Sequence, residues 1–299
     1  MPERQPPQII DPLAAIGSGE LGAFPFDLYE RHCLAQGDSW FSIGALPPTK
    51  TTRVLAELRL LQSTVIVNCA YPGAELRLMT DTTRAPHFRR FLAGRLAMKW
   101  HAILLSGGGN DLIAAAGVSP AAEPQLRLLR TPAERVAGPL TPADYLSDSG
   151  WDTFNGHIGA VFGQLVDLRD SDKTNRHTPL IWHNYARVMP RPAAAGAGFG
   201  PWLITALQQF AVPPADHLAV ADEMLARLRR LIDRLVAERR LADPQCNVFV
   251  ADSMSAGLVL AEPGTTDVSG DWVNEIHPTR GGYKKCAEAW HQVLDAQLA

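Results

Sequence analysis

The chain has 299 residues, 46% of them hydrophobic, and a net charge of −3 at pH 7. A chain of this length buries a sizeable core, and its near-neutral charge excludes the strong field that would attract nucleic acid or an anionic membrane. No apolar run approaches the ~20 residues of a membrane helix, and the polar segment Met1–Pro7 lacks the apolar core of a signal peptide. We therefore expect a cytoplasmic protein without an integral membrane segment and without a nucleic-acid partner.

The cysteines also favour a cytoplasmic protein. The four cysteines lie far apart, without the spacing of metal ligands: Cys33, Cys69, Cys246 and Cys286. The first three sit in or beside apolar runs, where a free cysteine behaves as a small hydrophobe. The cysteines therefore predict a reduced protein with no structural metal. We expect no cofactor.

The first 27 residues hold several prolines and little periodicity, which predicts an N-terminal tail or a wrapping segment. Residues 28–299 then carry five apolar runs of strand length, of which the second, Thr64–Cys69, is rich in the β-branched residues typical of a strand buried on both faces. The expected strands are His32–Gln36, Thr64–Cys69, His101–Leu105, Pro179–His183 and Asn247–Ala251.

Between these runs lie segments whose apolar residues recur at helical intervals. We expect a first helix that is capped by Thr49 and runs through Leu61, and a long helix that is capped by Asp216. Three further helices are expected over Pro86–Ala97, over Trp151–Leu168 and from near Gly281 to the C-terminus. The Gly- and Pro-rich stretch Pro190–Gly200 predicts a mobile loop over the sheet edge. The alternation favours one three-layer α/β/α domain, 28–299, with a five-stranded, mostly parallel sheet.

Polar residues follow two of the expected strands and precede the last helix. Gly37-Asp38-Ser39 places a hydroxyl at the carboxyl edge of the sheet, where ligands bind in open α/β folds, although a plain turn serine is also consistent. Gly107–Asp111 offers the Asn110 amide to developing negative charge. A phosphate cradle there lacks the required lysine or spaced-glycine pattern. His277 precedes Pro278, which favours an extended backbone that presents the imidazole from a loop.

Taken in order, these segments resemble the blocks of the SGNH (GDSL-type) hydrolase family. The resemblance covers most of the chain and implies a flavodoxin-like architecture. It implies Ser39 as the nucleophile and His277 as the base. It also implies an oxyanion site built from the backbone N–H of Ser39, that of Gly73 in Tyr71-Pro72-Gly73-Ala74, and the side chain of Asn110.

The chain departs from the family pattern at one position. The family usually carries Asp three residues before the histidine, and this chain has Asn274. An amide oxygen can accept from the imidazole N–H, but it cannot stabilise the imidazolium with a charge. Asp271 or Glu275 could reach His277 instead, or the site could work as a Ser-His dyad. We favour Asn274 as the residue that orients His277, with Asp271 nearby.

The resemblance implies an esterase or lipase that cleaves carboxylic esters through an acyl-enzyme. Its substrate would be a small-molecule or lipid ester. Aromatic and imidazole side chains near the Gly-rich loops are candidates for the substrate pocket: Trp40, His183 and Tyr185, with Phe41, Phe199 and Trp202. An acyltransferase acting on a sugar or alcohol and a catalytically silent binding protein on the same fold are the alternatives. The acyl chain length and the oligomeric state are left open.

Overall fold

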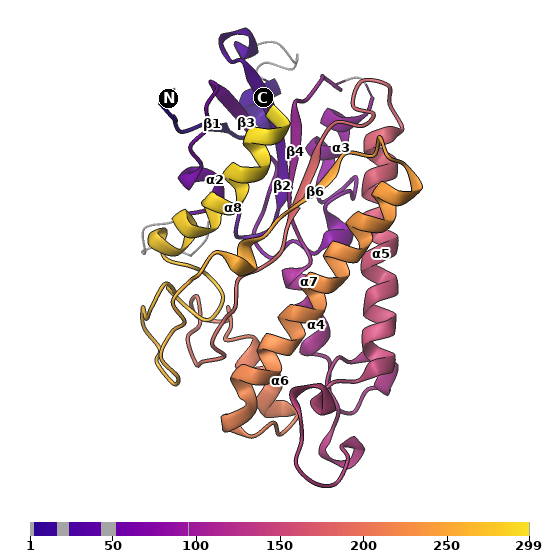
Figure 1. Cartoon of the computed structure of the whole chain (residues 1–299), viewed down its shortest axis with the longest axis vertical. Coiled ribbons are helices and arrows are strands. Elements are labelled where there is room, and N and C mark those ends of the chain that lie inside the picture. Colours follow the sequence, from indigo (N-terminus) through magenta and orange to yellow (C-terminus); the bar gives the residue numbers. More distant parts are fainter. Residues whose placement is uncertain (1–2, 17–23, 43–51, 95, 299) are drawn as a thin grey trace.

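The computed structural model describes residues 3–16, 24–42, 52–94 and 96–298 of the chain (Figure 1). At its centre is a six-stranded parallel sheet in the order β1-β3-β2-β4-β5-β6. The strands are β1 (Gln8–Ile10), β2 (Arg31–Gly37), β3 (Thr64–Asn68), β4 (Ala102–Ser106), β5 (Leu180–His183) and β6 (Val248–Ala251). The expected α/β class and parallel sheet are confirmed.

The sheet has one strand more than the sequence predicts. The additional strand, β1, lies in the Pro-rich segment expected to be a tail or a wrapping segment, and it pairs Ile9 with Ile66 of β3 at the sheet edge. Its three residues are too few to show a strand period, and they stand between Pro7 and Pro12. Proline at an edge strand removes no hydrogen bond that the sheet needs, so the pairing forms without a sequence signal.

The order of the other five strands is that of flavodoxin-like sheets. The chain reverses its direction of growth between β2 and β4, which are neighbours in the sheet with Gly37 opposite Ser106. In such sheets the crevice at this switch point, outside the carboxyl ends of the strands, is where ligands bind. The segments that follow β2 and β4 therefore meet at the position where a site is expected.

Helices cover both faces of the sheet (Figure 1). In β5, Trp182 stacks on Phe162 of α5 at 4.6 Å, whereas its neighbour His183 packs against Trp290 of α8 at 5.6 Å. Because successive strand residues point to opposite faces, α5 and α8 lie in different layers. The helices are α1 (Pro12–Ile16), α2 (Val54–Glu57), α3 (Pro86–Leu92), α4 (Gly109–Ala116), α5 (Asp148–Asp170), α6 (Leu203–Gln209), α7 (His217–Ala242) and α8 (Arg280–Leu298).

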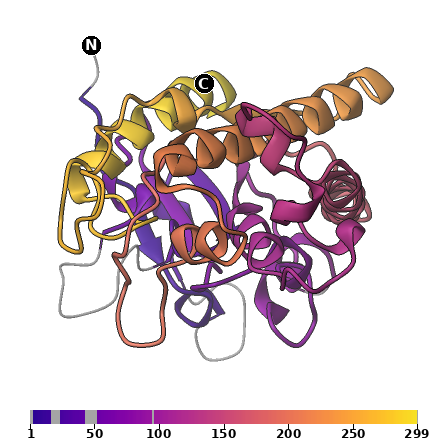
Figure 2. The same cartoon turned by 90° about the horizontal axis from the view of Figure 1, so that it is seen from below.

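Seen from below, α5 is viewed end-on beside the long helix α7, and α8 lies at the other side of the strands (Figure 2). The two long helices approach closely, since a Cβ on Gly159 of α5 would lie 3.3 Å from Leu235 of α7. Among the described residues, no helix has both the length and the apolar character needed to cross a membrane.

Two of the expected helices are shorter in the structure. The helix expected to run through Leu61 ends at Glu57, because the chain becomes extended at Leu58 and Leu60 then pairs with Gln5. Its expected cap, Thr49, lies outside the described residues. The helix expected over Pro86–Ala97 ends at Leu92, just before Gly94 adopts a left-handed backbone.

The expected cap of the long helix is also different. Asp216 immediately precedes α7, but its side chain makes no capping hydrogen bond there. The carboxylate instead accepts a hydrogen bond from the Tyr145 hydroxyl at 2.5 Å. The backbone at Asp216 is already in the helical region, whereas a capping residue needs a non-helical backbone to reach the free N–H groups of the first turn.

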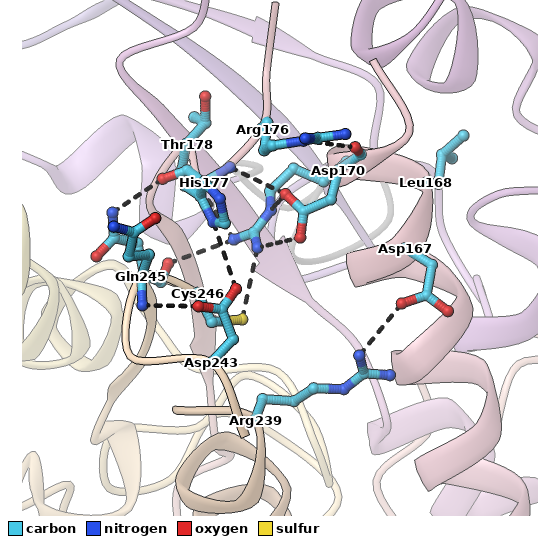
Figure 3. A network of polar contacts seen from close by, with 12 residues as sticks. Asp167, Leu168, Asp170, Arg176, His177, Thr178, Arg239, Asp243, Gln245 and Cys246 are labelled. Atoms are coloured by element: carbon cyan, nitrogen blue, oxygen red, sulfur yellow. Dashed lines mark hydrogen bonds and ion pairs between the residues drawn. The ribbon is translucent and has the colours of Figure 1, made fainter. Parts of the chain in front are cut away.

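The amino edge of the sheet is held by a polar network (Figure 3). The Arg169 side chain is fully buried at the end of α5 and binds the carboxylate of Asp170 in a bidentate pair. Its guanidinium also donates to the carbonyl oxygen of Thr178, just before β5, at 3.1 Å. This network satisfies a buried charge with hydrogen bonds and lies at the end of the strands opposite to Ser39.

Candidate active site

The backbone after β2 delivers Ser39 to the carboxyl edge of the sheet. At Gly37 the neighbouring strand comes so close that a Cβ would lie 2.6 Å from Cβ of Ser106, so only glycine fits. Two residues later the Ser39 side chain lies in a turn and is largely buried, with 9% of the residue exposed. The close strand approach thus requires glycine at the last residue of β2, directly before the turn that carries Ser39.

The loop before α8 brings a histidine to this hydroxyl from 238 positions away in the chain. His277 Nε2 lies 2.8 Å from Ser39 Oγ. The two loops are also joined through Trp40, whose indole N–H donates to the carbonyl oxygen of Ile276 at 3.2 Å. The ring of Trp202 packs edge-on against the imidazole at 5.8 Å. A serine hydroxyl within hydrogen-bond reach of a base is the geometry of an activated nucleophile.

Asn274 holds the other nitrogen of this imidazole. Its Oδ1 lies 3.0 Å from His277 Nδ1, and the same oxygen accepts the backbone N–H of Ile276 at 3.1 Å and of His277 at 2.9 Å. A rotated amide would aim its NH₂ group at two backbone donors, so the oxygen must face the ring. Nδ1 therefore carries the hydrogen, and Nε2 presents its lone pair to Ser39.

The environment of His277 keeps the ring neutral. The residue is 5% exposed, and burial lowers the pKa of its imidazole from 6.5 to about 4. Burial disfavours the charged form, and the amide of Asn274 brings no negative charge to offset that effect. At neutral pH the ring is thus unprotonated at Nε2 and able to accept the Ser39 proton.

Asp271 does not reach His277 in the structure. Its carboxylate forms an ion pair with Lys285 at 2.7 Å and accepts the backbone N–H of Val259, also at 2.7 Å. Although partial burial raises the pKa of Asp271, these partners hold it below its usual value. The expectation that Asp271 lies near the imidazole as a source of charge is therefore not met, because Lys285 takes the carboxylate.

Glu275 does not reach the imidazole either. Its buried carboxylate accepts backbone N–H groups at the start of α6, from Trp202, Leu203 and Ile204, and a further one from Arg191. Burial raises the pKa of Glu275, while the four backbone donors oppose the shift. Glu275 therefore ties the segment that carries Trp202 to the loop that carries His277, and it holds the wall of the site in place.

The second and third segments predicted from the sequence meet beside Ser39. The Asn110 side chain donates from Nδ2 to the carbonyl oxygen of Ala74 at 3.1 Å, which uses one of its two hydrogens; the other has no acceptor among the residues that the structure describes. Gly73 has a φ of +73°, a conformation that favours glycine. Within the described part of the chain, the backbone N–H groups of Ser39 and Gly73 donate no hydrogen bond. These groups are thus available to a ligand.

A buried network that the sequence did not reveal supports the turn at Ser39. Asp38 accepts hydrogen bonds from the Tyr185 hydroxyl at 2.5 Å, from Ser106 Oγ at 2.8 Å and from the Trp40 backbone N–H at 3.0 Å. Burial raises the pKa of Asp38 to about 6, and these donors oppose the shift. Tyr185 also packs against the backbone before Asn110, since a Cβ on Gly109 would lie 2.7 Å from its ring. Tyr185 thus braces both segments.

His183 is a correction to the expected substrate pocket. The residue is fully buried beneath the site, and its Nε2 lies 2.8 Å from Ser106 Oγ. Because Ser106 gives its only hydrogen to Asp38, His183 must donate from Nε2, and its Nδ1 accepts from Ser253 at 3.2 Å. Burial lowers the pKa of His183 to about 3. It extends the network under Asp38 and is not among the residues that line the pocket beside Ser39.

The other aromatic candidates lie in the pocket, in the core or on the surface. A pocket of about 40 Å³ opens beside Ser39 and Asn110, and Trp40 and Tyr185 are among its walls. Phe41 is fully buried and stacks on the far side of His183. Phe199 is 58% exposed. Apolar residues that no sequence motif indicates complete the walls: Leu112, Ile113, Val188, Leu203, Leu225 and Ile276.

Several solved structures are similar to this chain. An extracellular lipase from Streptomyces rimosus matches at 15% identity with a TM-score of 0.47, covering 89% of this chain and 99% of that chain. Phospholipase A1 from Streptomyces albidoflavus NA297 matches at 14% identity with a TM-score of 0.47, over 89% and 99% of the two chains. An acetylxylan esterase from Geobacillus stearothermophilus matches at 12% identity with a TM-score of 0.42, over 89% and 94%.

No protein-family model and no curated protein matches the chain significantly. Structural similarity at these values does not assign an activity. A function for this protein must therefore come from the chemistry of its own site.

Proposed function

We propose that this protein is a serine hydrolase of the SGNH type that cleaves carboxylic esters through an acyl-enzyme. The observation that carries the proposal is the hydrogen-bonded row of three side chains, with Ser39 Oγ 2.8 Å from His277 Nε2 and His277 Nδ1 3.0 Å from Asn274 Oδ1. The proposed roles are nucleophile for Ser39, general base for His277 and orienting residue for Asn274. A nucleophile, its base and a group that orients the base are the parts that acyl transfer requires.

The proposed reaction has two halves. His277 takes the proton of Ser39 as the hydroxyl attacks the ester carbonyl carbon, and then passes that proton to the departing alcohol. The negative charge that develops on the carbonyl oxygen is stabilised by the N–H groups of Ser39 and Gly73 and by the free N–H of Asn110. In the second half, His277 takes a proton from a water molecule as that water attacks the acyl carbon. The bond to Ser39 Oγ then breaks, His277 returns the proton to that oxygen, and the acid leaves.

The amide of Asn274 orients the base but leaves the imidazolium without a neighbouring carboxylate. The tautomer that catalysis needs is secured by the two backbone N–H groups that hold the amide oxygen toward the ring. We therefore infer an enzyme with a base that works at unusually low pH, since the pKa of His277 is about 4. The loss of charge stabilisation should make its turnover modest.

The decisive test is covalent labelling of Ser39 with a fluorophosphonate probe, combined with hydrolysis of para-nitrophenyl acetate. Wild type should be labelled and active, and Ser39→Ala should lose both properties with a nearly unchanged melting temperature. Ser42→Ala is the matched control, because Ser42 lies in the same turn, is similarly buried, and bonds the Asp38 carbonyl oxygen instead of His277.

Each alternative predicts a different result in the same assay. Absence of labelling in folded wild type would overturn the proposal and favour a catalytically silent binding protein. Labelling followed by transfer of the acyl group to an added alcohol, at the expense of hydrolysis, would identify an acyltransferase. Retention of activity in Ser39→Ala would show that Ser39 is only a turn residue.

A further inference from the structure

The pocket beside Ser39 is small and has apolar walls. Its walls include Leu112 from α4, Val188 from the segment after β5, Leu203 from the start of α6 and Leu225 from α7. The pocket has a volume of about 40 Å³. Since one water-sized group needs about 10–15 Å³ of such space, the pocket accepts about three or four of them.

The position of the pocket indicates which part of an ester would enter it. The departing oxygen must lie close to His277 Nε2 to receive its proton, and the carbonyl oxygen must lie close to Asn110. Asn110 lines the pocket, whereas the His277 ring lies outside its described walls. The group that enters is therefore the carbon chain on the acyl side of the carbonyl, and the alcohol points the other way.

The walls also restrict the chemistry of that chain. Asp38 is the charged residue among the lining residues, and its carboxylate already accepts hydrogen bonds from Tyr185, Ser106 and the Trp40 backbone. An anionic acyl group would lie against this carboxylate without a cation to pair with, and such a buried charge is costly. An uncharged, apolar chain suits the walls.

The part of the pocket wall formed by Leu203 of α6 is held in place by hydrogen bonding and packing. The first residue of the helix, Leu203, is 3% exposed, and its backbone N–H donates to the buried Glu275 carboxylate at 3.0 Å. Leu225 is 6% exposed on α7, a helix in contact with α6. Packed helices resist the displacement that a longer chain would require.

We propose that this pocket is the acyl site and that it limits the substrate to esters of short, uncharged acids, from acetyl to butyryl. The inference rests on the proposed function, because it assigns the acyl half of the same reaction. Leu225 and Leu203 are two of the wall residues, and shortening either of them should relax the limit.

The experiment compares kcat/KM for para-nitrophenyl acetate, butyrate, hexanoate and octanoate on the purified full chain. Octanoate should be at least about 100-fold poorer than acetate, because each methylene without a place in an apolar pocket costs about tenfold or more. Leu225→Ala and Leu203→Ala each shorten one wall, and each should raise the octanoate-to-acetate ratio at least about tenfold. Leu231→Ala, a buried leucine of the same helix α7 that lies outside this pocket, is the matched control and should keep the wild-type ratio.

The outcomes separate this inference from the proposal beneath it. Wild type that cleaves octanoate as efficiently as acetate, or wall variants that both retain the wild-type ratio, would overturn the acyl limit while Ser39 is still labelled by the fluorophosphonate. A protein that neither labels nor cleaves any of the four esters would overturn the hydrolase itself. The wild-type series decides the acyl limit even if a wall variant fails to fold.

Discussion

The substitution Asn274→Asp tests how the base is held. It keeps the shape of the side chain and exchanges an amide for a carboxylate at the atom that accepts from His277 Nδ1, 3.0 Å away. The two backbone N–H groups that now hold the amide oxygen would hold a carboxylate oxygen equally well, so the geometry should survive. The variant therefore adds one negative charge next to the imidazole and changes little else.

The magnitude follows from this distance. A unit charge 3.0 Å from Nδ1 favours the imidazolium by about 5.5 kcal/mol at an effective dielectric constant of about 20. The cost of burying the new carboxylate offsets part of this gain, and shifts beside an opposite charge are typically about 1–3 pKa units. The pKa of His277 should therefore rise from about 4 to about 5–7.

The sign of the effect on activity is different at the two ends of the pH range. The neutral imidazole is the active form, so the acid limb of kcat/KM should move upward with the pKa, and the variant should lose activity between about pH 4 and its new pKa of about 5–7. On the alkaline plateau the carboxylate stabilises the imidazolium that forms in the transition state. The plateau rate should rise at least about tenfold, which corresponds to one pKa unit.

The assay is a pH profile of kcat/KM on para-nitrophenyl acetate for wild type and Asn274→Asp, with a melting curve for each protein. An acid limb that stays in place, in a variant that folds normally, would refute the assignment of Asn274 to His277. A fall in the plateau rate would show that the charge disturbs the ring instead of stabilising it.

Three further substitutions test the rest of the site. Asn110→Ala should lower kcat by roughly 10²–10³ with little change in KM in steady-state assays, because one oxyanion donor is lost; a KM effect alone would make Asn110 a substrate-binding group. Asp271→Asn breaks the ion pair with Lys285, away from His277, so kcat/KM should change only a few-fold at any pH; a loss near ~10⁴ would make Asp271 the triad acid. Glu275→Gln replaces a carboxylate oxygen with an NH₂ group that faces backbone donors, so urea unfolding should show a loss of about 2–4 kcal/mol; unchanged stability would contradict its role at α6.

The main strands and the long helices could be predicted from the sequence because their signals are local. A run such as Val65-Ile66-Val67 is β-branched and apolar throughout, and only a strand covered on both faces buries all three of these side chains. The location of Ser39 and Asn110 at the carboxyl edge of the sheet could also be predicted. Both residues come soon after such strands, and the carboxyl ends of parallel strands lie at one edge of the sheet. A three-residue strand such as Gln8–Ile10 carries no period and could not be recognised.

The contacts within the site depended on tertiary packing. Asn274, Asp271 and Glu275 all stand within six positions of His277, and nothing in their spacing ranks them. In the folded chain Lys285 takes the carboxylate of Asp271, the start of α6 takes that of Glu275, and the amide of Asn274 remains for the imidazole. The role of each of these three side chains is therefore decided by the partners that the fold brings to it.

The same distinction separates the pocket from the motifs around it. His183 ends a strand at the carboxyl edge, as a pocket residue would, yet its side chain points into the layer beneath and binds Ser106 and Ser253. The walls at Leu203 and Leu225 belong to helices whose apolar residues look like any other core positions. Sequence determines which residues are apolar and which elements they form, because those choices depend on neighbours along the chain. Which apolar residues leave a gap beside Ser39 is decided by how distant helices pack, and only the tertiary structure contains that information.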